Sequence, residues 1–171
     1  MTTEQLKAGS TSFRWLILSA IIIIADQVTK ILVVQNLFEY ERIFLLPILD
    51  LVRYHNRGAA FSLFADGGGW QIWFFSSVAL IISAFILCYQ WVLPRSGCRT
   101  LAAGLALILG GAIGNVIDRL VYGHVVDFIL FYYEEWAWPA FNVADSAITV
   151  GVTLVIIDSL FFEKDRKQQA A

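Results

Sequence analysis

Four long apolar stretches, separated by more polar segments, dominate the chain. They cover approximately residues 13–34, 70–93, 100–117 and 141–162. A helix needs roughly 20 apolar residues to cross a bilayer, and each stretch reaches or approaches that length. Over residues 1–171 the pattern therefore predicts an all-α membrane protein, a single integral membrane domain with four transmembrane helices.

The first stretch is hydrophobic enough to be mistaken for a secretory signal peptide. Its apolar core is long, however, and no clear small-x-small cleavage site follows it. Asp26 and Lys30 continue its helical pattern, whereas a signal peptide has a short apolar core that ends at the cleavage site. We therefore interpret this stretch as a retained transmembrane span.

Two longer segments, residues 35–69 and 118–140, connect the helices. The first mixes short apolar runs with Asn56, Gly58 and a glycine triplet, a pattern typical of strands and turns. The sequence FYYEEWAWPAF at 131–141 is aromatic and acidic, and such residues favour the membrane interface. The expected fold therefore adds a small extended or β platform and an interfacial segment on the outer side.

Small residues recur at every fourth position of the third stretch, at Ala102, Ala106, Gly110 and Gly114. This spacing places them on one face of a helix. Small residues on one face let a neighbouring transmembrane helix approach closely. We expect this face to pack against another helix, and we assign it no chemistry.

The composition agrees with a membrane protein. Of the 171 residues, 58% are hydrophobic and 15% are charged, and the mean hydropathy is +0.69. A soluble domain carries about 25% charged residues, so the apolar excess must face lipid. The formal net charge is -2 and no basic run is present, which argues against a nucleic-acid partner. Cys88 and Cys98 form no recognisable disulfide or metal framework.

Lysine and arginine indicate the orientation, because they are enriched on the cytoplasmic side of membrane proteins. The two tails and the 94–99 turn contain seven of them: Lys7, Arg14, Arg95, Arg99, Lys164, Arg166 and Lys167. The two longer segments contain four: Arg42, Arg53, Arg57 and Arg119. We therefore expect both termini in the cytoplasm and both longer segments outside.

Ionisable residues inside a bilayer are costly and are therefore candidates for function. Asp26 and Lys30 share one helix face, roughly 20 Å from the cytoplasmic end at about 1.5 Å per residue. Other polar residues lie at the outer ends of the third and fourth stretches: Asn115, Asp118, Arg119, His124, Asp127, Asn142, Asp145 and Thr149. Ion pairs with purely structural roles would be distributed over both sides of the membrane. Because these polar residues all lie toward the outer side, the pattern predicts one polar site at the outer face.

The residue types in this cluster favour carboxylate chemistry. His55 and His124 are far apart and no H-E-x-x-H helix exists, so a metal site is poorly supported. No G-x-S-x-G or Ser–Lys pattern indicates a serine nucleophile. Two aspartates in a low-dielectric site share a proton, so one can activate water while the other polarises a carbonyl and protonates the leaving amine. We predict peptide hydrolysis without metal or cofactor, although composition alone does not select the two aspartates.

Five short segments carry a resemblance to a known family. They are DQVTK (26–30), YHNRGAAFS (54–62), GGAIGNVIDRL (110–120), HVVDFIL (124–130) and FNVADSAIT (141–149). In order and spacing they resemble the successive signature motifs of lipoprotein signal peptidases, also called type II signal peptidases. The resemblance extends over about residues 13–162.

The resemblance implies a role for each matched residue. Asp127 and Asp145 would be the catalytic dyad of an aspartic endopeptidase, supported by Asp26, Lys30 and Asp118. The substrate site would be lined by Asn56, Gly58, Asn115, Arg119, Asn142 and Ala144.

The resemblance also implies the partners and the location. The substrate would be a bacterial prolipoprotein with a diacylglyceryl group on its lipobox cysteine, cut just before that cysteine. Membrane lipid and globomycin-like cyclic peptide inhibitors would be further partners, which would make the protein an antibiotic target. We expect a monomer in the bacterial inner membrane, with its active site at the periplasmic face.

Several of these polar residues also have structural interpretations. Asp118 could form only a local ion pair with Arg119, and Asp26 and Lys30 could simply neutralise each other. Asn115 and Asn142 could cap helix ends. We expect His124 to be a solvated loop residue and Asp158, near the cytoplasmic end, to be unconnected with catalysis.

Two other classes of function compete with the peptidase. One is a small proton- or ion-coupled transporter, because buried Asp, Lys and His residues also form relays. Four spans without an inverted repeat, and cytoplasmic halves nearly free of polar residues, argue against it. The other is a non-enzymatic assembly factor that docks partners on its outer segment. Cleavage of a lipidated prolipoprotein by the purified protein would separate the peptidase from both.

Single cysteines moved to positions 68, 96 and 168 test the predicted topology. In intact cells, an impermeant thiol reagent should label Gly68→Cys but neither Ser96→Cys nor Gln168→Cys. The reason is that seven of the eleven basic residues outside the spans lie on the side of positions 96 and 168. Labelling of Ser96→Cys or Gln168→Cys from outside would show that the orientation is the opposite of the predicted one.

Overall fold

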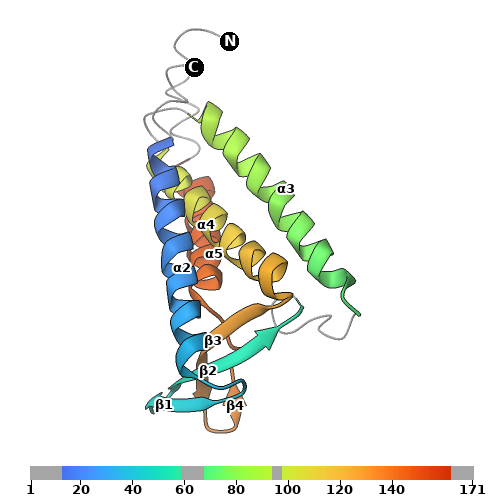
Figure 1. Ribbon diagram of the computed structural model, residues 1–171. Coiled ribbons are helices and arrows are strands. Elements are labelled where there is room, and N and C mark those ends of the chain that lie inside the picture. The colour runs from blue at the N-terminus through green and yellow to red at the C-terminus, as the bar shows by residue number, and fades with distance from the viewer. Residues whose placement is uncertain (1–12, 59–67, 94–97, 163–171) are drawn as a thin grey trace.

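The computed structural model describes residues 13–58, 68–93 and 98–162 and consists of a helix bundle with a small sheet at one end (Figure 1). A 3-10 turn, η1 (Phe13–Trp15), leads into α2 (Leu16–Asn36), which is followed by α3 (Trp70–Val92), α4 (Arg99–Tyr122) and α5 (Val143–Phe161). These 4 helices are long and apolar enough to cross a membrane. The predicted fold class is confirmed.

Helix α4 is the centre of the bundle and contacts α2, α3 and α5. Its most apolar window is 61% buried, against 17–22% for the other three helices. On α2, the apolar side chains of Ile17, Ile21 and Ile24 face outward, whereas Asp26 and Lys30 are buried. Lipid is as apolar as isoleucine, so burying such side chains gains little, and the helices bury their polar groups instead.

Small residues on two faces of α4 allow its neighbours to approach closely. Toward α2, Ser19 Oγ donates to the carbonyl oxygen of Ala106 at 2.8 Å, and a Cβ atom on Gly110 would lie 2.9 Å from the Ser19 carbonyl oxygen. Toward α5, a Cβ atom on Gly111 would lie 2.3 Å from the carbonyl oxygen of Ala144. The packing role of the predicted stripe is confirmed, and Gly111 belongs to a second face that the four-residue spacing did not predict.

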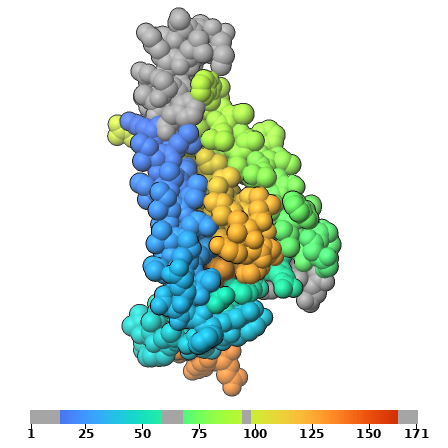
Figure 2. Space-filling model, viewed as in Figure 1, coloured from blue at the N-terminus to red at the C-terminus, as the bar shows by residue number. Residues whose placement is uncertain are grey.

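The sheet is antiparallel, with the strand order β1-β2-β3-β4. Its strands are β1 (Arg42–Leu46), β2 (Leu49–Asn56), β3 (Val125–Tyr133) and β4 (Trp136–Ala137). The space-filling view shows that it projects beyond the helices at one end (Figure 2). The predicted β platform is confirmed. The second connecting segment, of which only residues 131–141 were expected to be interfacial, supplies two strands of this sheet. That segment also begins later than expected, because α4 continues to Tyr122.

Strand β3 connects the sheet to the helices. On one side it pairs with β2, where Tyr54 lies opposite Asp127. On the other side the N–H groups of Phe128 and Ile129 donate to the carbonyl oxygen of Phe141, at 3.0 and 2.9 Å. These bonds hold the beginning of α5 beside β3, so that side chains from a strand and from a helix terminus meet.

Gly111→Ala tests the close approach of α4 and α5. The added methyl group would meet a backbone oxygen at 2.3 Å, so the two helices must separate. Overpacking of this kind costs about 1–3 kcal/mol, and the midpoint of thermal unfolding in detergent should fall accordingly. Val121→Ile adds one methyl group at an exposed position of the same helix and should leave the midpoint unchanged. Equal midpoints for Gly111→Ala and the wild type would contradict the packing.

Candidate active site

Asp127 and Asp145 contact the same asparagine at the junction of the sheet and α5. Asn142, the N-cap residue of α5, donates from Nδ2 to Asp127 Oδ1 at 2.8 Å. Its side-chain oxygen accepts from the backbone N–H of Asp145 at 2.9 Å, and its own N–H donates to Asp145 Oδ2 at 3.3 Å. This reciprocal pair is a capping box, and it satisfies the first N–H groups of the helix. One fully buried residue therefore holds both carboxyl groups, that of Asp127 through its side chain and that of Asp145 through its backbone N–H.

Two further asparagines complete the hydrogen bonding of the carboxyl groups. Asn56 at the end of β2 donates to Asp127 Oδ2 at 3.0 Å, and Asn115 on α4 donates to Asp145 Oδ1 at 2.8 Å. The side-chain oxygen of Asn115 accepts from Lys30 Nζ at 3.0 Å. Because this oxygen faces an ammonium group, the amide nitrogen of Asn115 must point toward Asp145.

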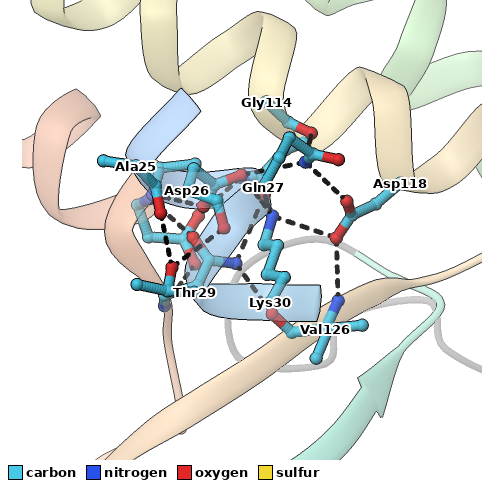
Figure 3. Close-up of polar contacts among 12 residues, drawn as sticks. Ala25, Asp26, Gln27, Thr29, Lys30, Gly114, Asp118 and Val126 are labelled. Carbon is cyan, nitrogen blue, oxygen red and sulfur yellow. Dashed lines mark hydrogen bonds and ion pairs between the residues drawn. The ribbon is translucent and has the colours of Figure 1, made fainter. Parts of the chain in front are cut away.

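Lys30 lies between two carboxylates next to this group (Figure 3). Its Nζ atom is 2.8 Å from Asp26 Oδ2 and 2.9 Å from Asp118 Oδ2, and all three side chains are at most 3% exposed. Buried charges are stable only when they are paired and hydrogen-bonded. Asp26 and Lys30 do pair, as one interpretation expected, but they also contact the site through Asn115. The alternative interpretation, in which Asp118 forms only a local ion pair with Arg119, is wrong, because Asp118 pairs with Lys30.

Arg119 connects three elements around the site. Its Nη2 atom donates to the carbonyl oxygen of Gly58 at 3.1 Å, just beyond the end of β2. Its guanidinium group lies 5.7 Å from the centre of the Phe75 ring on α3. A positive charge on α4 is thereby held beside the two aspartates.

A groove of about 680 Å³ opens between α3, α4 and α5 in front of the aspartates. Its polar lining consists of Asn56, Asn115, Arg119, Asp127, Asp145, Ser146 and Thr149. The other lining residues are apolar and come mainly from the three helices. Asn142 and Ala144 are 0% exposed and lie next to the aspartates on the side away from the groove. Gly58 is also buried. Of the residues expected to line the substrate site, three therefore face the groove and three do not.

His55 and His124 form a stacked pair beside the sheet, with ring centroids 3.8 Å apart. His55 Nδ1 lies 2.9 Å from Glu39 Oε1. Burial lowers the pKa of both histidines. His124 lies in a loop, as expected, but it is half-buried against His55 and not fully solvated. Among the described residues, no three His, Cys, Asp or Glu side chains gather in a way that could hold a metal ion.

The pKa of Asp127 is raised to about 7. Burial is the main cause, because it disfavours the charged carboxylate, and the charge of Asp145 adds to it. Hydrogen bonds from Asn56 and Asn142 and the charge of Lys30 act in the opposite direction. A carboxyl group with this pKa can both give and accept a proton near neutral pH, as general acid–base catalysis requires.

Most of the chain matches one protein family. Residues 18–161 match the family model described as signal peptidase (SPase) II. The chain belongs to this family. Lipoprotein signal peptidases of Cupriavidus necator and Burkholderia mallei are 47% and 49% identical over 154 and 160 residues. The matched parts cover 90% and 92% of this chain and 86% and 94% of the two relatives.

Solved structures agree with this assignment. Two bacterial membrane enzymes, determined by the in meso method at 2.3 and 1.9 Å resolution, match with TM-scores of 0.75 and 0.73. They are 29% and 28% identical in sequence, and the matches cover 86% and 88% of this chain and 87% and 94% of theirs. The resemblance found in the sequence is confirmed, and the protein is a protease of the signal peptidase II family. The comparisons give no support to a transporter.

Gln27 is a residue of the site that the sequence analysis did not single out. Its Nε2 atom donates to Asp118 Oδ1 at 2.9 Å and lies 3.2 Å from both Asp26 Oδ2 and the carbonyl oxygen of Gly114. A signal was present, because Gln27 is part of the DQVTK motif that carried the resemblance to signal peptidases. The groove-lining residues of α3, such as Phe75, had no comparable signal, because they look like any lipid-facing residue.

Asp127→Asn tests the raised pKa through stability. With a pKa of about 7 when folded and an ordinary value of 3.8 when unfolded, the folded protein keeps a proton that the unfolded chain loses. The bound proton stabilises the folded protein fully below the pKa that Asp127 has in the unfolded chain. This stabilisation is lost as the pH rises through the pKa that Asp127 has in the folded protein. The unfolding temperature of the wild type should therefore fall more than that of Asp127→Asn between about pH 4 and 7. Parallel curves for the two proteins would contradict the shift.

Proposed function

We propose that this signal peptidase II is an aspartic endopeptidase with Asp127 and Asp145 as its catalytic dyad. The relatives it matches are named lipoprotein signal peptidases. The proposed substrate is a prolipoprotein with a diacylglyceryl group on its lipobox cysteine. The peptide bond just before that cysteine is cut, which releases the signal peptide.

The observation that carries this proposal is the contact of both aspartates with Asn142 at the wall of an apolar groove. Held next to each other, the two carboxyl groups share one proton. The ionised member takes a proton from water, and the water oxygen attacks the carbonyl carbon. The protonated member polarises the carbonyl oxygen and later protonates the leaving nitrogen as the C–N bond breaks. No covalent intermediate with the enzyme is needed.

The groove suits an apolar substrate that approaches from the bilayer. Its walls are formed by transmembrane helices, so a signal peptide or an acyl chain can stay among apolar side chains while its polar end reaches the aspartates. We propose that Asn56, Asn115 and Arg119 contact the substrate directly. The remaining substrate-site residues act differently: Asn142 and Ala144 shape the site from behind, and Gly58 acts through its bond to Arg119.

The proposed orientation places the sheet and the dyad at the outer face of the inner membrane, with both termini in the cytoplasm. The excess of basic residues in the tails and in the 94–99 turn supports this orientation. The same groove would bind cyclic peptides of the globomycin kind, and the protein would act as a monomer. A prolipoprotein that is already lipidated meets the dyad on this side without crossing the membrane.

Removal of either carboxylate tests the dyad. Asp127→Asn and Asp145→Asn should each lower turnover of a lipidated prolipoprotein by at least about 100-fold, the usual contribution of a general acid or base. The double variant should lose little more than either single variant, because the two groups act as one unit. Turnover is measured per correctly inserted molecule.

Asp158→Asn is the matched control. Asp158 is also a buried aspartate of α5 but lies near the end of the helix opposite to Asp145. This variant should retain nearly full turnover. Substantial turnover by Asp127→Asn or Asp145→Asn would refute the aspartic mechanism while leaving the family assignment unaffected.

A further inference from the structure

Asp26 has a second bond besides its ion pair with Lys30. Its Oδ2 atom faces Lys30 Nζ, while its Oδ1 atom accepts the backbone N–H of Ala144 at 2.9 Å. Ala144 lies in the first turn of α5, where N–H groups have no acceptor within the helix. It is also the residue immediately before Asp145. Asp26 therefore fixes the backbone that carries one member of the proposed dyad.

Asp118 makes the equivalent contact on the other side of Lys30. Its Oδ2 atom faces Lys30 Nζ at 2.9 Å and also accepts the backbone N–H of Val126 at 3.1 Å (Figure 3). Val126 is the residue immediately before Asp127 on β3. The two carboxylates of the ion triad therefore reach the two backbone segments that carry the dyad, one on a helix and one on a strand.

We infer that the triad of Asp26, Lys30 and Asp118 is a spacer that sets the distance between Asp127 and Asp145. The proposal rests on the proposed function of these two aspartates. Lys30 holds two carboxylates against one nitrogen atom, and each carboxylate holds the backbone before one dyad member. The three residues of the triad are thus positioning residues, which act through the dyad and not on the substrate.

The contacts of Lys30 make this spacer stiff. An ammonium group has three N–H donors, and those of Lys30 go to Asp26, Asp118 and the side-chain oxygen of Asn115. Gln27 braces the same two carboxylates, at 3.2 and 2.9 Å. Any shift of one carboxylate would leave a buried charge with an unsatisfied bond, which is costly where water is absent.

The spacing matters because the chemistry depends on mutual repulsion of the carboxylates. Two aspartates share a proton only while the charge of one opposes ionisation of the other. A triad that merely neutralised buried charges would tolerate a longer side chain of the same charge. A spacer would not, because the backbone N–H group would be displaced together with the carboxylate.

Asp26→Glu and Asp118→Glu distinguish these roles, because they keep the charge and add one methylene group. Each should lower kcat by at least about tenfold, since a displacement near 1 Å is enough to cost that much, and should leave KM within about threefold. The alkaline limb of the kcat/KM profile should also move to lower pH. The charge of Asp145 helps to raise the pKa of Asp127, and this effect weakens as the two groups separate. Lys30 and Arg119, which also face the dyad, keep their charges in both variants.

Asp158→Glu is the matched control, since it lengthens another aspartate that is only 1% exposed, near the far end of α5. It should retain the kcat and the pH profile of the wild type. All rates refer to folded, monodisperse protein in detergent. Wild-type kcat and an unshifted profile in both Asp26→Glu and Asp118→Glu would overturn the spacer. A lower kcat with an unshifted pH profile of kcat/KM would also overturn it, because a purely structural role of the triad gives that result.

A triple variant, Asp26→Asn/Lys30→Met/Asp118→Asn, carries the test if the glutamate variants fail to fold. It removes all three buried charges at similar volume, and such replacements often keep a protein folded. The folded triple variant should lose kcat by about 100-fold, and wild-type kcat would overturn the proposal. A wild type that cleaves no lipidated prolipoprotein would instead refute the proposed function, so the two failures are distinguishable.

Discussion

Charges buried in a bilayer must satisfy one another, and in this protein that requirement is met at one end of α4. Lys30 on α2 contacts Asp26 on its own helix and Asp118 on α4, and through Asn115 it reaches the beginning of α5. The apolar surfaces of these helices face lipid and provide little drive for association. The polar contacts, together with close backbone packing, therefore determine which helices meet and in which register.

Close packing along α4 makes these polar contacts possible. Glycines such as Gly110 and Gly111 bring α2 and α5 so near that short aspartate and asparagine side chains can bridge between helices. Helix α3 is held differently, with Gln90 Nε2 donating to the carbonyl oxygen of Ala102 at 3.1 Å. The apolar groove lies where α3 borders α4 and α5. In the proposed function, the closely packed part of the molecule carries the chemistry and the groove beside it receives the substrate.

The sheet contributes one of the two aspartates of the proposed dyad. Asp127 belongs to a strand whose neighbours are β2 on one side and the backbone of Phe141 on the other. Asp145 belongs to a helix whose first turn is closed by Asn142. Joining a strand to a helix terminus through one asparagine brings two like charges together in a place from which water is largely excluded. In the proposed mechanism, this arrangement lets the pair activate water without a covalent intermediate.

The sequence by itself determined the four spans, the gathering of polar residues at one end of the bundle, and, through five short motifs, the family and both aspartates of the proposed dyad. These features are local, because apolar runs and motif spacing are properties of neighbouring residues. The tertiary structure decided which polar groups pair. Lys30 bonds to Asn115, 85 positions away, and Asp118 turns from the adjacent Arg119 toward Lys30. Likewise, His124, in the turn before β3, stacks against His55 of β2. A helical face shows which residues point inward but not which helix or strand will lie opposite them, and that depends on how the whole bundle packs.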